Sequence, residues 1–315
     1  MKRDVLRIRD LARDEAEAIL ALAGRLKTKL RAGRPHPLLA GRTLAMIFEK
    51  PSLRTRVTFE VGMGQLGGSA IHLAPGDIKL GERESPGDIA RNLERWVDLV
   101  MARTFLHQSV ADLAAAARVP VINGLSDLHH PCQVLSDCFT LLEHRGLVAG
   151  STATISQIAG LRVAFIGDGN NMVHSWMDAA ARLGFDFVLA CPPGYEPDPA
   201  ITAEAGKRVT ITQDVDAAAR GADVVYTDVW TSMGQEAEHE QRLEAFSRYQ
   251  INDTLVGFAK SSALVMHCLP AHRGEEITDS VLDGQRSIVL EQAENRLHAQ
   301  KAALLHLLGG SLDDA

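Results

Sequence analysis

The chain has 315 residues, of which 46% are hydrophobic and 23% charged, and its formal net charge is -7 at pH 7. This length usually divides into two hydrophobic cores, so we expect two domains of about 150 residues each. The negative charge disfavours nucleic acid as a partner, because phosphates repel an acidic surface. The sequence has no apolar run of about 18 residues that could span a membrane, and its N-terminus carries acids throughout, unlike a signal or transit peptide. We therefore expect a cytoplasmic protein with no membrane partner.

The cysteines are Cys132, Cys138, Cys191 and Cys268, and no two of them form a C-x-x-C pair. A disulfide framework or a structural zinc site is therefore not expected. The segments "HHPCQ" and "MHCLPAHRG" contain histidine and cysteine, but they lack the regular ligand pairs that a closed metal site needs. The sequence accordingly predicts neither a metal nor a cofactor.

The first half of the chain alternates apolar runs with helical patterns. Helices are predicted over about 14–31, 88–96, 109–117 and 131–145. The apolar runs that suit buried strands are "RTLAMIFE" (42–49), "SAIHLAP" (69–75), "VDLVMART" (97–104) and "VPVINGLS" (119–126). This βαβα order indicates a parallel sheet that helices cover on both faces.

The second half repeats this order after a small, polar and unpatterned segment over 146–160, where we place the domain boundary. We predict domains 1–148 and 149–315, with a final helix over about 291–308 that can pack back on the first domain. The predicted strands lie within 161–171, 185–193, 208–213, 222–230 and 263–271. The fold class is therefore α/β, with two doubly wound parallel-sheet domains and an active site in the cleft between them, at the carboxyl ends of the strands.

The stretch "IFEKPSLRTRVTFEVG" (47–62) places cations and hydroxyls at the start of a predicted helix. A helix N-terminus already presents unpaired N–H groups and a partial positive charge. Ser52, Arg54 and Thr55 at that point would make a receptor for a small anion, above all a phosphate. An ordinary capped helix with solvated arginines would give the same pattern.

Polar segments follow four other predicted strands: "ART", "GDGNN", "DVWTSMG" and "HCLPA". Because these strand ends meet on one face of each sheet, they favour the ligand site over the capped helix. "GDGNNM" imitates a dinucleotide-binding fingerprint, but Met172 takes the third glycine position and the next strand ends in Cys191 and Pro192 instead of a ribose-binding acid. A nicotinamide dehydrogenase is therefore a remote alternative, and a non-catalytic anion-binding module is another.

Six segments together resemble one family in the expected order. "SLRTR" is similar to the family motif S-T-R-T-R and "HPCQ" to H-P-x-Q, and "GDGNN", "DVWTSMGQE", "HCLPAHRGEE" and "AENRLHAQKA" match further segments. The resemblance is to the ornithine branch of the aspartate/ornithine carbamoyltransferase superfamily. It implies transfer of the carbamoyl group of carbamoyl phosphate to the δ-amine of L-ornithine, giving L-citrulline and phosphate, in arginine biosynthesis or in the reverse, catabolic direction. A related acceptor such as putrescine or N-acetylornithine is the alternative.

The resemblance also implies the site residues. Those for carbamoyl phosphate are Ser52, Leu53, Arg54, Thr55, Lys79, Arg103, His130, Gln133, Cys268, Leu269 and Arg296, and those for ornithine are Asn171, Asp228, Ser232 and Met233. The catalytic group comprises Arg54, Arg103, His130, Asp228 and Cys268, with Cys268 as a substrate contact and not a covalent nucleophile. An amine that attacks a planar carbonyl forms a tetrahedral oxyanion and expels phosphate, so cations and N–H donors matter more than a nucleophile.

Two positions depart from the family pattern. Leu53 replaces the usual threonine, and we expect its side chain to point away from the anion. Lys79 replaces a common glutamine in the loop 75–85, which in this superfamily reaches a neighbouring subunit's site and implies a homotrimer or a larger assembly of trimers. Lys79 could serve as a mobile point charge for phosphate. Alternatively, the loop no longer reaches the neighbouring site.

Overall fold

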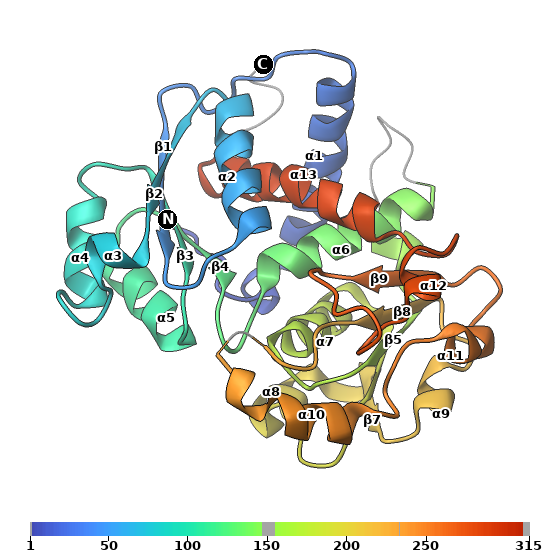
Figure 1. The fold of residues 1–315 in the computed structure, drawn as a ribbon. Coiled ribbons are helices and arrows are strands. Elements are labelled where there is room, and N and C mark those ends of the chain that lie inside the picture. Colours follow the sequence, from blue (N-terminus) through green and yellow to red (C-terminus); the bar gives the residue numbers. More distant parts are fainter. Residues whose placement is uncertain (1, 147–154, 233, 311–315) are drawn as a thin grey trace. The chain divides into compact units, whose positions relative to one another are not determined.

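The computed structural model describes residues 2–146, 155–232 and 234–310. The chain divides into two units, and the first comprises the described residues up to Gln157 together with those from Glu294 onward. The second unit is Ile158–Ala293 (Figure 1). The predicted boundary between residues 148 and 149 lies outside the described residues.

The first unit contains a parallel sheet with the strand order β2-β1-β3-β4. The strands are β1 (Thr43–Phe48), β2 (Ser69–Leu73), β3 (Leu99–Arg103) and β4 (Val121–Leu125). Each lies within one predicted apolar run, so the prediction of a parallel sheet here is confirmed. From β1 the chain builds β2 on one side and β3 on the other, which makes the β1/β3 pair the switch point where such sheets bind ligands.

Helices cover both faces of this sheet. Ala45 and Ile47 are two residues apart on β1 and therefore lie on the same face of the sheet. There they pack with Ile89 of α4 and with Val110 and Leu113 of α5. The helices are α1 (Arg13–Arg31), α2 (Leu53–Gln65), α3 (Pro75–Ile78), α4 (Pro86–Leu93), α5 (His107–Ala116) and α6 (Pro131–His144), with short 3-10 turns η1 (Ile8–Asp10) and η2 (Ile155–Gln157).

The second unit contains a parallel sheet with the order β7-β6-β5-β8-β9. Its elements are β5 (Arg162–Ile166), α7 (Asn171–Leu183), β6 (Asp186–Ala190), α8 (Pro199–Ala205), η3 (Gly206–Arg208), β7 (Val209–Thr212), α9 (Val215–Ala219), β8 (Val224–Thr227), η4 (Glu236–Glu238), α10 (His239–Phe246), α11 (Asp253–Phe258), β9 (Leu264–His267) and α12 (Asp279–Leu282). All five predicted strands are present, and the α/β fold is confirmed in both units. The switch point here lies between β5 and β8.

The two faces of the second sheet differ in chemistry. On one face Trp176 of α7 stacks over Phe187 at a centroid distance of 6.3 Å, and Phe165 stacks over Tyr226 at 5.3 Å. On the other face aliphatic strand residues pack against α9, α10, α11 and α12, with Phe246 among them. These dense cores hold the strand ends in place, so that the loops after β5 and β8 have a rigid base.

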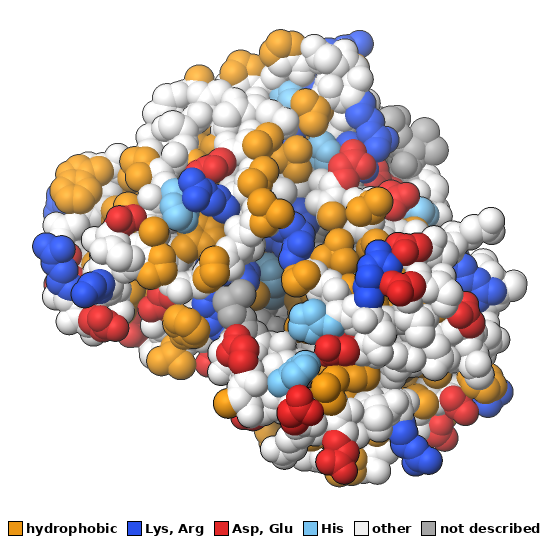
Figure 2. All heavy atoms as spheres, in the orientation of Figure 1, with side chains coloured by type: hydrophobic (Ala, Val, Ile, Leu, Met, Phe, Trp, Pro, Cys, Tyr) orange, Lys and Arg blue, Asp and Glu red, His pale blue; other side chains and the backbone are white. Residues whose placement is uncertain are grey.

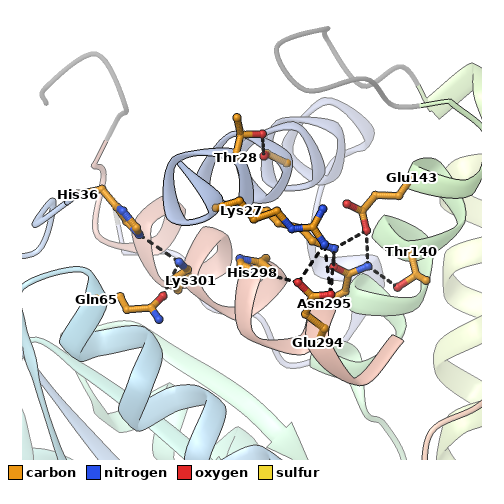
Figure 3. A network of polar contacts seen from close by, with 12 residues as sticks. Lys27, Thr28, His36, Gln65, Thr140, Glu143, Glu294, Asn295, His298 and Lys301 are labelled. Carbon is orange, nitrogen blue, oxygen red and sulfur yellow. Dashed lines mark hydrogen bonds and ion pairs between the residues drawn. The ribbon is translucent and has the colours of Figure 1, made fainter. Parts of the chain in front are cut away.

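The last helix, α13 (Val289–Leu307), begins two residues before the predicted start, and its residues from Glu294 onward belong to the first unit. Lys27 of α1 donates to Asn295 of α13 at 2.7 Å and to Glu143 of α6 at 2.8 Å, and Asn295 donates to Thr140 at 3.0 Å (Figure 3). A buried amide and an ion pair therefore lock α13 against α1 and α6. Within the described ranges, no helix combines the length and the apolar character that a membrane span requires.

Candidate active site

The phosphate-type motif lies at the switch point of the first unit, where α2 begins directly after β1. Ser52 is the N-cap, and its hydroxyl accepts from the Thr55 N–H at 3.2 Å. The two arginines differ, because Arg56 is exposed and pairs with Glu60 at 3.4 Å whereas Arg54 is partly buried. The Leu53 side chain is 76% exposed. The helix is therefore capped, and Arg54 is the less exposed arginine of the pair.

Three guanidinium groups act on one buried histidine. His130 is the N-cap residue of α6, and its side chain makes no capping hydrogen bond. Its pKa lies well below the ordinary value because of burial first, and then because of the positive charges of Arg296, Arg103 and Arg54. His130 is therefore neutral at neutral pH, within a cationic cluster. Arg103 is 8% exposed and is the last residue of β3, opposite Phe48, the last residue of β1. It thus lies at the carboxyl ends of the strands.

Arg296 comes from α13 and is held by α2 and α6. Its Nη1 donates to the Gln133 side-chain oxygen at 2.6 Å, and its Nη2 donates to the Thr55 hydroxyl at 3.0 Å. Both glutamine and arginine are buried. The structure therefore brings Thr55, which the helix-start motif indicated, together with Gln133 and Arg296, which only the family resemblance suggested.

Lys79 differs from these residues in its surroundings. It is the C-cap residue of α3 in a left-handed conformation, with φ of 45°, and it is exposed. It lines a surface hollow with Gly76, Glu82 and Arg83. The single chain thus presents Lys79 outward, whereas Arg103, His130 and Gln133 are buried.

In the second unit, Asp228 follows β8 at the switch point and is the centre of the other candidate set. Its carboxylate accepts from the Val229 N–H at 2.8 Å, from the Cys268 thiol at 2.8 Å and from the Asn170 amide at 3.1 Å. Asn170 also caps α7, since its oxygen accepts from the Met172 N–H at 2.9 Å. The sequence indicated the Asn170-Asn171 pair as a hydrogen-bonding group for a small carboxylate or amide, but the predicted site residues include only Asn171.

The other predicted ornithine residues lie on the flanking loops. Asn171 is the first residue of α7, and Ser232 lies on the loop after β8, where its N–H donates to the Gln235 side chain at 3.1 Å. Both are partly buried. Met233 lies outside the described residues.

A buried ion pair joins the loops that follow β5 and β8. Arg242 of α10 contacts Asp168 at 3.0 Å and also donates to the Trp230 carbonyl at 2.9 Å. Burial raises the pKa of Asp168 to about 6, although the Arg242 charge opposes this shift. No local pattern in the sequence indicates this pair, because Asp168 and Arg242 are far apart in the chain. Arg242 links Asp168 to the Trp230 carbonyl, two residues after Asp228.

The "HCLPA" segment is held by a second buried pair. The Leu269 N–H donates to His267 Nδ1 at 2.8 Å, and His267 Nε2 lies 3.0 Å from Glu276, to which it donates because Nδ1 is the acceptor. Leu269 has a φ of 60°, a left-handed conformation that is strained for a leucine and that these contacts support. Cys268 is thereby presented toward Asp228, as its thiol contact shows.

The ligand-type atoms of Asp228, His267 and Cys268 lie within 4.8 Å of one another. Both ring nitrogens of His267 are already engaged, with Leu269 and with Glu276. A neutral imidazole in that state has no lone pair to offer a cation. This cluster is consequently better suited to hydrogen bonding than to metal binding.

Comparison with known proteins gives a consistent family. Residues 3–143 match "Aspartate/ornithine carbamoyltransferase, carbamoyl-P binding domain", and residues 159–307 match "Aspartate/ornithine carbamoyltransferase, Asp/Orn binding domain". The chain is 50% identical to an ornithine carbamoyltransferase of Thermococcus kodakarensis, over 98% of this chain and 97% of that one. An anabolic ornithine carbamoyltransferase of Pyrococcus furiosus is also 50% identical, over 98% and 97%. The solved structure of a Pyrococcus furiosus ornithine carbamoyltransferase superposes with a TM-score of 0.91, at 50% identity over 98% of each chain.

Proposed function

This chain belongs to the aspartate/ornithine carbamoyltransferase family, and we propose that it transfers the carbamoyl group of carbamoyl phosphate to the δ-amine of L-ornithine, giving L-citrulline and phosphate. The observation that carries the proposal is the cationic cluster of Arg54, Arg103 and Arg296 around a neutral His130, at the switch point of the first sheet. Such a cluster suits a small dianion. We assign the first unit to carbamoyl phosphate and the second to ornithine.

In the proposed reaction the first unit stabilises charge. Arg54 and Arg103 bind the phosphate with the help of Ser52, Thr55 and the first N–H groups of α2. His130 is neutral and donates a hydrogen bond to the carbamoyl oxygen without carrying a charge of its own. Arg296, which donates to Gln133, is one of the positive charges that act on His130. The negative charge that develops on the carbonyl oxygen and on the leaving phosphate meets donors that are already oriented, so little reorganisation is needed.

The second unit selects the acceptor amine. We propose that the Asp228 carboxylate receives the α-ammonium of ornithine, that Asn171 donates to the α-carboxylate, and that Ser232 and Met233 complete the pocket. Three donors already fix the position of the Asp228 carboxylate, which supports a role in orienting a substrate. Cys268 and the Leu269 backbone meet the carbamoyl portion. The δ-amine must be neutral to attack, so turnover rises with pH as that amine loses its proton.

The experiment that tests this function is a citrulline-type assay with four acceptors offered in parallel: ornithine, putrescine, N-acetylornithine and aspartate. Ornithine is the expected substrate, because acceptors without the α-ammonium leave the buried Asp228 carboxylate without a cationic partner at a cost of several kcal/mol. Activity with aspartate alone would sink the proposal, and a preference for putrescine or N-acetylornithine would transfer it to that acceptor.

We also propose that the chain forms a homotrimer in which Lys79 acts at a neighbouring subunit's site. A stripe of apolar side chains on α2 supports an assembly of identical copies, since Leu53, Val57 and Val61 recur every four residues and are 76%, 45% and 42% exposed. Figure 2 shows hydrophobic side chains on the surface over α2. Ile71 on the edge strand β2 is also exposed. Lys79 itself is exposed, as a residue that serves a neighbour must be before assembly.

A further inference from the structure

One turn after Arg296, α13 carries another buried side chain, Gln300, which contacts the Arg296 guanidinium. Gln300 is 1% exposed. The orientation of its amide follows from its neighbours: the oxygen accepts from Arg296 Nη2 at 3.0 Å and from Nε at 3.3 Å, and the nitrogen donates to the Thr58 hydroxyl at 2.5 Å. Gln300 therefore contacts the guanidinium along its Nε/Nη2 edge.

Both ends of this contact are anchored by further hydrogen bonds. On one side the Thr58 hydroxyl, which accepts from Gln300, donates to the Arg54 carbonyl at 2.6 Å. On the other side Gln133, which accepts from Arg296, donates to the fully buried Asp137 at 2.8 Å. Each amide thus uses its nitrogen elsewhere and keeps its oxygen toward the guanidinium. The plane of the guanidinium is fixed from α2, α6 and α13.

Three side chains that contact the Arg296 guanidinium are neutral: Thr55, Gln133 and Gln300. A carboxylate in place of the Gln300 amide would hold the arginine at least as firmly, because a charge-assisted hydrogen bond is stronger than a neutral one. It would also cancel part of the positive charge that an anionic substrate needs. A glutamine at this position orients the arginine and leaves its charge available.

We propose that Gln300 is a positioning residue that sets the Arg296 guanidinium for carbamoyl phosphate through a neutral contact; this inference rests on the proposed function, in which Arg296 binds that substrate. Gln300 acts through Arg296 and does not touch the substrate. Its replacement therefore loses its effect once Arg296 is absent, a non-additivity that a purely structural residue does not show.

The test is a double-mutant cycle on the full-length protein, with the dissociation constant of carbamoyl phosphate as the readout. Gln300→Leu weakens binding about tenfold, the scale of one hydrogen bond to a charged group. In an Arg296→Leu background the same change alters binding by less than about twofold. An equal loss in both backgrounds would overturn the positioning role while leaving the proposed function intact. If Arg296→Leu binds carbamoyl phosphate normally, the assignment of Arg296 fails and the inference fails with it.

A second variant keeps the inference testable if Gln300→Leu does not fold. Gln300→Glu retains the acceptor and nearly the same shape, so the protein remains folded while carbamoyl phosphate binding weakens about tenfold or more. Normal binding by a folded Gln300→Glu protein would contradict the neutral-contact argument.

Asn295→Leu is the matched control, because Asn295 is a buried amide on the same helix whose contacts run to Lys27, Thr140 and Glu143 (Figure 3). It lowers the Tm and leaves the dissociation constant unchanged. If Asn295→Leu weakened binding as much as Gln300→Leu, the loss would be a general effect of disturbing α13 and the inference would be wrong.

Discussion

The two units organise their switch points with opposite charge. In the first unit, cations from α2, β3 and α13 lie around a histidine that burial, and then these charges, keep neutral. In the second unit, a carboxylate after β8 is held by an amide, a thiol and a backbone N–H. One architecture thus presents guanidinium groups at the switch point of one unit and a carboxylate at that of the other. The fold supplies the location, and the side chains at the strand ends supply the chemistry.

Removing a cation from the first unit should have the largest effect on activity. Arg103→Leu should cost about 2 to 4 kcal/mol of transition-state stabilisation, the range for a lost charge-assisted donor at a developing anion. Steady-state kinetics should show the loss in kcat/KM for carbamoyl phosphate, with the Tm little changed. Arg56→Leu is the control, because Arg56 is solvated and pairs with Glu60. Near-normal turnover of Arg103→Leu would contradict the role of this cation in binding carbamoyl phosphate.

The corresponding change in the second unit is Asp228→Asn. It should lower ornithine turnover by about a hundredfold or more, because one charged contact is lost. The control is carbamoyl phosphate binding by the same variant, which should remain almost unchanged. A kinetically silent Asp228→Asn would mean that the ornithine site is misplaced.

The pH dependence of stability sharpens the comparison. Burial, together with the charges of Lys301, Lys27 and Arg31, lowers the pKa of His298 in the first unit to about 3, below its ordinary 6.5. Between these two pKa values the histidine is protonated in the unfolded chain and neutral in the folded chain. This group therefore lowers the stability as the pH falls below about 6.5. In the second unit the pKa of Asp168 is raised from 3.8 to about 6, so its effect has the opposite sign: stability falls as the pH rises through this range.

These opposite signs can be measured by chemical denaturation of single variants between pH 4.5 and about 6. In this pH range the unfolding free energy should decrease less steeply with falling pH in His298→Gln than in the unaltered protein. The expected difference in slope is about 1.4 kcal/mol per pH unit. Asp168→Asn should steepen the same decrease by a similar amount, since it removes the opposing group. Shifts of the same sign in both variants would contradict the charge environments described for the two units.

The smallest expected signal comes from subunit mixing. Arg103→Leu and Lys79→Ala proteins, each inactive, should regain activity when their subunits exchange, because about a quarter of the sites would receive one intact contribution from each chain. Native mass spectrometry would establish that hybrids form. Hybrids without activity would show that Lys79 contributes nothing across the interface.

The strands could be predicted because buried parallel strands are written as continuous apolar runs, as in "TLAMIF" and "LVMAR". The helix α3 has only four residues, too few for a periodic pattern, and was not predicted. Ser52 and Arg54 carry a local signal, since a cap and a cation at a helix start are adjacent in the sequence. Arg296 has none, because its partners Gln133 and Thr55 lie 163 and 241 residues away, and only the family resemblance suggested it. The contacts of Gln300 with Thr58, of Asp168 with Arg242 and of Asn170 with Asp228 also join residues far apart in the chain, so no local pattern predicts them.

Equilibrium binding of carbamoyl phosphate in the absence of ornithine tests the proposal that the cationic cluster of the first unit binds the phosphate, whereas Asp228 of the second unit serves the acceptor amine. We predict that Arg103→Leu weakens binding by about a hundredfold, within the range for a lost charge-assisted donor, while Asp228→Asn binds as the unaltered protein does. Equal weakening in both variants, or normal binding by Arg103→Leu, would contradict the assignment of the cationic cluster to carbamoyl phosphate.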